Sequence, residues 1–260
     1  MRIASPGHAV FASVMIALGV QGLTTGQFTA VWQPVPSGVP ARDALVYFCA
    51  GVSLACGLGV LWRRTAADAA RLLLVCLLMW VALFRAPDII RAPASFGPWD
   101  GCAETTAMVA GAWVLYAWFA AAWDRQRVGF ATGDGGVRIA RVLYGLALIP
   151  FGLAQLLYVK QTAALVPGWL PAHMAVAYVT GVAFLAAGVA VLTNVCARLA
   201  AALSALQIGL FTLLVWVPIV AAGTKDPYQI SEFAISAAIT AAAWVVADSY
   251  RLRQVADTNR

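Results

Sequence analysis

The chain repeats itself at a spacing of 130 residues. Each half contains about four long apolar segments, and identical residues recur at equivalent places. The matching pairs are Ala17/Ala147, Leu18/Leu148, Gly22/Gly152, Leu23/Leu153, Val46/Val176, Gly51/Gly181 and, one residue further along, Gly57/Gly188 and Trp113/Trp244. Self-similarity at a fixed period indicates a duplicated structural unit. The repeat predicts a tandem duplication of a four-helix unit, and it constrains the fold more than any catalytic motif does.

Composition places this duplicated unit in a membrane. Apolar residues make up 62% of the chain and charged residues 11%, whereas soluble domains carry roughly 25% charged residues. A soluble core of this size cannot hide so much apolar surface, so we expect the lipid bilayer as a partner. The net charge of +6 comes from cations in loops and does not indicate a nucleic-acid partner. The five cysteines form no C-x-x-C pair, which argues against a disulfide framework or a zinc site.

Eight apolar segments are predicted to span the membrane. They cover residues 8–24, 43–62, 69–87, 102–123, 140–158, 173–193, 199–222 and 232–250. Residues 124–139, rich in Gly, Arg and Asp, are expected to be a cytoplasmic linker. The predicted fold class is all-α integral membrane, with two parallel four-helix bundle repeats in residues 1–123 and 140–260, the second ending in a short cytoplasmic tail. The repeats are expected to be parallel because each has an even number of spans.

The distribution of cations predicts the orientation. Of the 17 Lys and Arg residues, 12 fall at one membrane side. The other side has 5, namely Arg42, Arg85, Arg91, Lys160 and Lys225. Cytoplasmic loops carry an excess of Lys and Arg. We therefore expect both termini and the linker in the cytoplasm, and a multi-pass protein of a bacterial-type inner membrane.

The second half carries a series of motifs in a characteristic order. It contains Arg141-x-x-x-Gly145, Gly152, Val166-Pro167-Gly168-Trp169-Leu170-Pro171, Tyr178-x-x-Gly181, Gly188 and Arg198-Leu-Ala-Ala. Over residues 138–222 this resembles the DoxX and DoxX-like superfamily of small four-helix membrane proteins. The first half resembles it more weakly, because Gln33-Pro34-Val35-Pro36 and Pro40 replace the Trp-Leu-Pro turn.

The resemblance implies a four-helix membrane unit and a limited choice of functions. Some members are associated with thiosulfate:quinone oxidoreduction and others with membrane complexes that handle oxidative stress. A quinone is therefore the one cofactor that the resemblance suggests. Many relatives have an acidic residue shortly after the glycine of the second helix, but here Gly181 is followed by Val182, Ala183, Phe184 and Leu185. This departure argues against a carboxylate-dependent redox or proton role at that position.

Charged side chains gather at the turns predicted on the outer side. Arg85, Asp88, Arg91, Asp100 and Glu104 bracket the turn between the third and fourth spans, and Lys225, Asp226 and Glu232 bracket the equivalent turn of the second half. One interpretation is a polar vestibule for a small substrate or a quinone head group. The other is that these charges end helices and reach the interface as ion pairs. Arg85 and Glu104 are the residues expected at real depth, because each is embedded in the apolar edge of its span.

Two uncharged groups complete the candidate set. His173 begins the sixth span, where it is either an interfacial helix-start residue or a quinone contact. Gln155 lies within the fifth span and either bonds between helices or binds a ligand. Pro150 and Pro218 interrupt spans of the second half and free backbone carbonyls, so a cavity is expected there. The candidate ligand or vestibule residues are thus Arg85, Asp88, Glu104, His173, Glu232 and Gln155.

The sequence contains no serine elbow, metal triad or phosphate-binding loop, so we assign no catalytic residue and no metal site. His8 and His173 lie at opposite predicted membrane ends, too far apart to ligate one haem. Three functions follow. The first is a non-enzymatic membrane component or a subunit of a membrane protein complex. The alternatives are a quinone-linked oxidoreductase subunit, and a small-molecule or lipid transporter.

Overall fold

The computed structural model describes residues 3–29, 33, 35–36 and 38–258, and every regular element in this part of the chain is a helix. The first half contains α1 (Pro6–Thr25), α2 (Arg42–Leu61), α3 (Ala66–Trp80), the π-helix η1 (Val81–Arg85), α4 (Ala86–Arg91) and α5 (Phe96–Phe119). The second half contains α7 (Gly133–Leu157), α8 (Val159–Leu165), α9 (His173–Thr193), α10 (Ala197–Phe211), the π-helix η3 (Thr212–Trp216), α11 (Val217–Ala221) and α12 (Pro227–Thr258). Arg2 and Arg260, counted for the orientation, and Pro34 lie outside the described residues.

Seven helical segments of the described chain are long and apolar enough to cross a membrane, as in a multi-pass membrane protein. They are Pro6–Thr25, Arg42–Leu61, Ala66–Arg91, Gly133–Leu157, His173–Thr193, Ala197–Ala221 and Pro227–Arg251. Each matches a predicted span to within a turn or two of helix. The all-helical, multi-pass class is therefore confirmed.

The eighth predicted span, 102–123, is helical as α5 but is not among these seven segments. The middle of α5 is almost entirely buried inside the protein. A helix that protein covers on most sides does not need the hydropathy of a lipid-facing helix, so α5 carries Glu104 and Thr105 within its length. The eight-span count stays a prediction.

Elements of the two halves recur at one spacing. α10 and η3 begin and end 131 residues after α3 and η1, and Ala172, which precedes α9, has the same left-handed backbone (φ 56°) as Ala41 (φ 53°), which precedes α2. Each π-helix is followed by a proline, Pro87 or Pro218. Proline has no N–H to donate to the carbonyl four residues back, and its ring clashes with that carbonyl, which explains why the ladder widens there.

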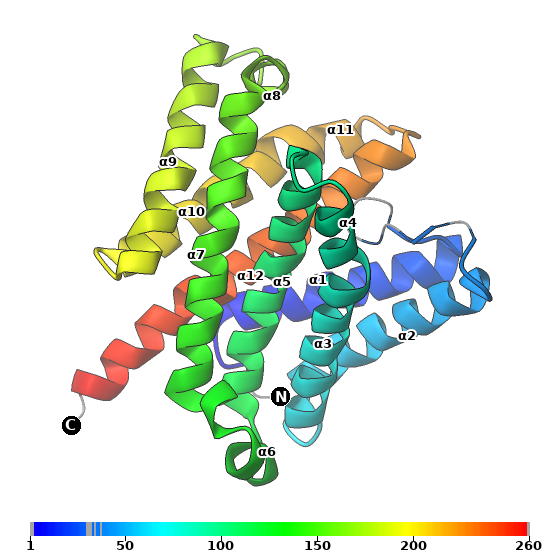
Figure 1. The fold of residues 1–260 in the computed structure, drawn as a ribbon, viewed down its shortest axis with the longest axis vertical. Coiled ribbons are helices and arrows are strands. Elements are labelled where there is room, and N and C mark those ends of the chain that lie inside the picture. The colour runs from blue at the N-terminus through cyan, green and yellow to red at the C-terminus, as the bar shows by residue number, and fades with distance from the viewer. Residues whose placement is uncertain (1–2, 30–32, 34, 37, 259–260) are drawn as a thin grey trace.

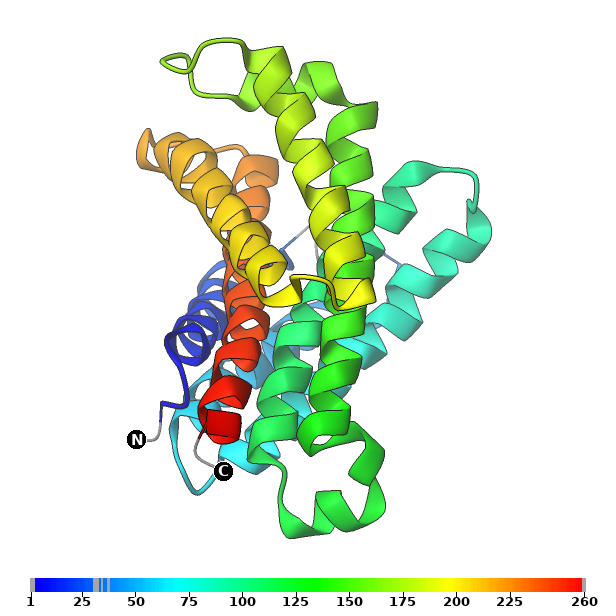
Figure 2. The ribbon, with the colours of Figure 1, turned by 90° about the vertical axis from the view of Figure 1, so that its left-hand side faces the viewer.

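The two halves interlock. In each half the first two long helices pack together, and the second, third and fourth pack in sequence. The first helix, however, lies against the fourth helix of the other half: α1 packs on α12, and α7 packs on α5 (Figure 1). Figure 2 shows α12 (red) between α1 (blue) and the pair of α5 and α7 (green). The sequence left open whether the halves form separate bundles. In the structure the first helix of each half packs on the fourth helix of the other, so the two halves are joined.

The centre of the molecule is the crossing of α5 and α12. A Cβ atom on Gly111 of α5 would lie 2.8 Å from the Cα and Cβ atoms of Ala242. Ala110, Ala112, Ala241 and Ala243 beside this contact are fully buried. Small residues let the two backbones approach this closely inside a membrane protein.

The segment expected as a linker, 124–139, is folded. It contains the end of α6 (Ala122–Arg127), the 3-10 turn η2 (Gly129–Ala131) and the first turns of α7. Asp124 is fully buried. Its carboxylate accepts hydrogen bonds from Arg71, the Tyr116 hydroxyl and the backbone N–H of Ala121, each at 3.1 Å. This carboxylate fastens the segment to α3 and α5.

Glycines also set the spacing of α1 and α2. A Cβ atom on Gly57 would lie 2.8 Å from the backbone nitrogen of Ile16 and 2.9 Å from the carbonyl oxygen of Ala12. Gly51, on the same helix, has no neighbour within 4 Å of a Cβ. The two positions form a matched pair for testing the role of this contact.

We predict that Gly57→Val destabilises the protein by about 1–3 kcal/mol, because the added side chain overpacks the α1–α2 contact. Gly51→Val, the control, should leave the stability close to that of the wild type. The measurement is the free energy of unfolding in mixed micelles. Equal losses for the two variants would contradict the packing described here.

Candidate functional site

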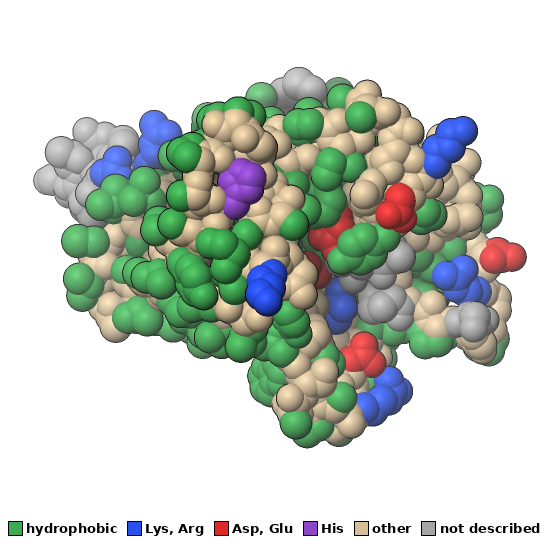
Figure 3. All heavy atoms as spheres, turned by 90° about the horizontal axis from the view of Figure 1, so that it is seen from above, with side chains coloured by type: hydrophobic (Ala, Val, Ile, Leu, Met, Phe, Trp, Pro, Cys, Tyr) green, Lys and Arg blue, Asp and Glu red, His purple; other side chains and the backbone are tan. Residues whose placement is uncertain are grey.

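A cavity of about 560 Å³ is lined by α5 from the first half of the chain and by α7, α8, α9, α10, η3, α11 and α12 from the second, so most of its lining comes from the second half. This is the half in which the sequence predicted a cavity. Seen from above, acidic side chains (red) lie recessed in a hollow near the middle of this face (Figure 3). The polar lining residues are Asp100, Glu104, Gln155, Tyr158, Gln161, Thr162, Asp226, Tyr228, Gln229, Glu232 and Ser236.

Carboxylates from two helices face this cavity. Asp100 and Glu104 are four residues apart on α5, so they lie on one face of the helix, and Glu232 comes from α12. The three groups are close enough to interact electrostatically. The close crossing of α5 and α12 brings these carboxylates to one place, although 128 residues separate Glu104 from Glu232 in the sequence.

Arg85 is the buried cation beside this cluster. Its guanidinium lies 3.9 Å from the Glu104 carboxylate, and its Nε donates a hydrogen bond to the Thr105 hydroxyl at 3.2 Å. A Cβ atom on Gly101 would stand 2.5 Å from Arg85 Nη1, so this glycine makes the room for the guanidinium. Arg85 is the last residue of η1 and is 7% exposed. Arg85 and Glu104 are thus buried within the protein, and their depth in the membrane stays a prediction.

Aromatic rings form much of the remaining wall. Phe151 of α7 and Phe184 of α9 meet edge to face with their ring centroids 6.1 Å apart. Phe211 and Trp216 do the same at 6.1 Å. Trp216 ends η3 and is buried. It stands 131 residues after Arg85, at the same place in the second π-helix.

Gln155 of α7 presents an unsatisfied acceptor. Its side chain lines the cavity, and its Oε1 atom is buried without a hydrogen-bond partner among the described residues. Buried polar atoms in proteins almost always have a partner, and an orphan needs an explanation. A ligand that donates a hydrogen bond from within the cavity would satisfy this oxygen.

The structure brings together four of the six residues singled out in the sequence. Glu104, Gln155 and Glu232 line the cavity, and Arg85 contacts Glu104. Asp88 instead pairs with Arg91 at 3.0 Å on α4, and His173 is the first residue of α9; neither lines the cavity.

Sequence reasoning did not single out Tyr228 or the aromatic wall, and it left Asp100 among the interfacial charges. The signal for Asp100 and Tyr228 was their spacing, because each lies four residues before a chosen glutamate, Glu104 or Glu232.

His8 is a structural residue. It is fully buried; its Nδ1 accepts from the backbone N–H of Ala4 at 3.2 Å, and its Nε2 lies 3.0 Å from the carbonyl oxygen of Val60. Nδ1 is an acceptor here, so Nε2 carries the proton and donates to Val60. The ring therefore joins the start of α1 to the end of α2. Among the described residues, no group of three or more His, Cys, Asp or Glu side chains could hold a metal ion.

Comparison with known proteins identifies no relative. No family model matches the chain, and searches of curated proteins and of solved structures find no match. The DoxX resemblance therefore stays a prediction, carried only by the motifs quoted above.

We predict strong coupling between Arg85 and Glu104. Arg85→Met alone should lower the free energy of unfolding by about 3 kcal/mol, because it leaves a buried carboxylate without its cation. Arg85→Met combined with Glu104→Gln should recover most of that loss, since both charges are then gone. Unfolding of the three variants in mixed micelles gives the coupling energy, and simple additivity would show that the two side chains do not act as a pair.

Proposed function

We propose that this protein is a membrane carrier for a small organic cation with N–H donors, such as a protonated amine. The observation that carries the proposal is the pairing of an acidic, aromatic cavity with two interrupted helices. η1 and η3 stand at corresponding places in the two halves, and they supply Arg85 and Trp216 beside the cavity. Interrupted spans at corresponding places in repeated halves are typical of transporter binding sites.

The charge balance favours a cationic ligand. With all groups ionised, the four lining carboxylates carry four negative charges, and Arg85 beside Glu104 supplies one positive charge. These carboxylates are Asp100, Glu104, Asp226 and Glu232. Like charges in a poorly hydrated site are unfavourable, and a bound cation relieves this repulsion. The acidic side chains of this site do not form a group fit to hold a metal ion, which favours an organic cation over a bare divalent metal.

The rest of the lining favours an amine with an apolar body. The face of an aromatic ring attracts a cation, and Phe151, Phe184 and Trp216 offer such rings. An ammonium N–H would also satisfy the orphan Oε1 atom of Gln155. The volume of about 560 Å³ falls within the roughly 300–1,000 Å³ of typical small-molecule sites.

The topology proposed for this carrier has eight spans, α5 included, with both termini in the cytoplasm of a cell with an inner membrane. The start of α1, the end of α12 and α6 lie toward one end of the molecule, and α8 and the turn after α11 toward the other (Figure 1). This arrangement supports the side assignment obtained from the cations. The cavity would then open toward the outer side.

The other sequence-based functions stay predictions. A non-enzymatic subunit of a membrane complex would bind its partner through an outer surface, and that role would leave the acidic cavity without a function. A quinone-linked oxidoreductase subunit would use the same cavity, with hydrogen bonds from Tyr158 or Tyr228 to the quinone oxygens. The surplus of carboxylates favours the amine, because a neutral quinone would not relieve their repulsion.

The proposal predicts that 2-phenylethylammonium binds to the purified protein and that 2-phenylethanol, a neutral analogue of similar shape, does not. Glu232→Gln should weaken amine binding by about 10- to 100-fold, because a hydrogen bond to a charged group contributes about 1.5–3 kcal/mol. Isothermal titration in mild detergent measures both effects.

Asp43→Asn is the matched control, since it removes an exposed carboxylate in the first turn of α2 that does not line the cavity. Its affinity for the amine should equal that of the wild type. Equal binding of the alcohol, or an equal loss in the control, would contradict the proposal.

A further inference from the structure

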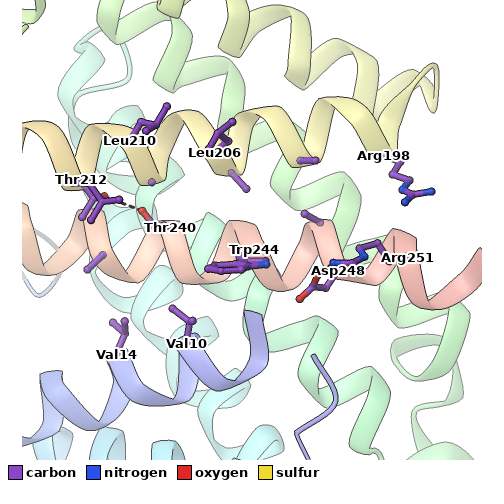
Figure 4. A pocket seen from close by; sticks show the side chains of 16 residues that line it. Val10, Val14, Arg198, Leu206, Leu210, Thr212, Thr240, Trp244, Asp248 and Arg251 are labelled. Carbon is purple, nitrogen blue, oxygen red and sulfur yellow. Dashed lines mark hydrogen bonds and ion pairs between the residues drawn. The ribbon is translucent and has the colours of Figure 1, made fainter. Parts of the chain in front are cut away.

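A second concave surface lies on another side of α10 and α12. This groove of about 700 Å³ is bounded by α1, α10 and α12. Its floor and walls are mainly apolar, with Val10, Val14, Leu206, Leu210 and Leu213 along its length. Two cations, Arg198 and Arg251, stand at the same end of it (Figure 4). The groove shares no lining residue with the acidic cavity.

The groove has the length of one lipid leaflet. From Arg198 to Leu213 along α10 the helix advances about 22 Å at 1.5 Å per residue. Half of a ~30 Å hydrocarbon core together with one headgroup region measures about 20–22 Å. A lipid whose headgroup lies at Arg198 would therefore extend its acyl chain to the far end of the groove, near Thr212 and Thr240.

The charged end favours an anionic headgroup. Arg198 and Arg251 oppose one carboxylate, Asp248, which lies 3.8 Å from Arg251 and also accepts a hydrogen bond from the backbone N–H of Gly7 at 2.9 Å. Among the described residues that line this end of the groove, two cations therefore face one carboxylate, a balance complementary to a phosphate. Basic pockets between membrane helices recognise anionic lipid headgroups in this way.

We infer that the groove between α1, α10 and α12 is a binding site for an anionic phospholipid, with the phosphate at Arg198 and Arg251 and one acyl chain along Val10, Leu206 and Leu210. This site does not depend on the proposed carrier function. It would hold a lipid whether or not the acidic cavity binds an amine.

The test is native mass spectrometry of the full-length chain in mild detergent, titrated with phosphatidylglycerol and with phosphatidylcholine of the same acyl chains. Wild type should retain phosphatidylglycerol at least tenfold more strongly. Arg198→Ala should reduce its retention to that of phosphatidylcholine. Ala202→Trp, which fills the groove from an exposed lining position, should reduce retention of both lipids.

The controls are Arg63→Ala, which removes a cation outside the groove, and Ala186→Trp, which adds a ring to another exposed helix face. Both should retain lipid like the wild type. Glycerophosphoglycerol, the soluble headgroup, should bind far more weakly than the intact lipid. Wild-type retention in Arg198→Ala, an equal loss in Arg63→Ala, or headgroup binding as strong as that of the lipid would overturn the inference.

Discussion

The close crossing of α5 and α12 is the constraint on which the rest of the structure depends. At Gly111 and Ala242 the two backbones approach so closely that no side chain fits on the glycine. On one side of this crossing the helices carry Glu104 and Glu232 to a common cavity. A larger residue at Gly111 would separate the helices and with them the carboxylates, so a contact between small residues sets the electrostatics of the site.

The crossing also explains why the halves interlock. α5 and α12 pack against each other, and each also receives the first long helix of the other half, α7 or α1. The cavity and the groove lie on different sides of α10 and α12. Three hydroxyl groups lie between them. The Thr212 hydroxyl is 2.6 Å from the hydroxyl of Ser236, which lines the cavity, and 2.9 Å from the hydroxyl of Thr240, which lines the groove. The contact between η3 and α12 is thus polar between the two concave surfaces.

The positions of most spans and several charged residues of the cavity could be predicted from the sequence. Length and apolarity fix where most spans lie, because a bilayer demands both. The charged residues of the cavity could be singled out because Arg85, Glu104 and Glu232 lie within or next to apolar segments, where an ionisable group is costly without a partner. Asp100 and Glu104 are four residues apart and so lie on one helical face. Asp100 could therefore have been predicted at the same site as Glu104.

The arrangement of the helices could not be predicted in the same way. Membrane helices are apolar on nearly every side, so their sequence periodicity does not encode which helix packs on which. The packing of α1 on α12 and of α7 on α5 therefore had no sequence signal. Asp88 illustrates the same point: it is close in sequence to Arg85, but on α4 it pairs with Arg91 and does not line the cavity. Gln155 was a candidate from the sequence, but the sequence could not predict that its Oε1 atom lacks a hydrogen-bond partner among the described residues, because this depends on how α7 packs.

We propose that this membrane protein carries a small organic cation through the cavity. The most direct measurement is the uptake of labelled 2-phenylethylammonium into proteoliposomes that contain the purified full-length protein, compared with protein-free liposomes of the same lipid. The account predicts saturable uptake that requires the protein and is lost in Glu232→Gln. Uptake no faster than in protein-free liposomes, for a preparation that is folded and correctly inserted, would contradict it.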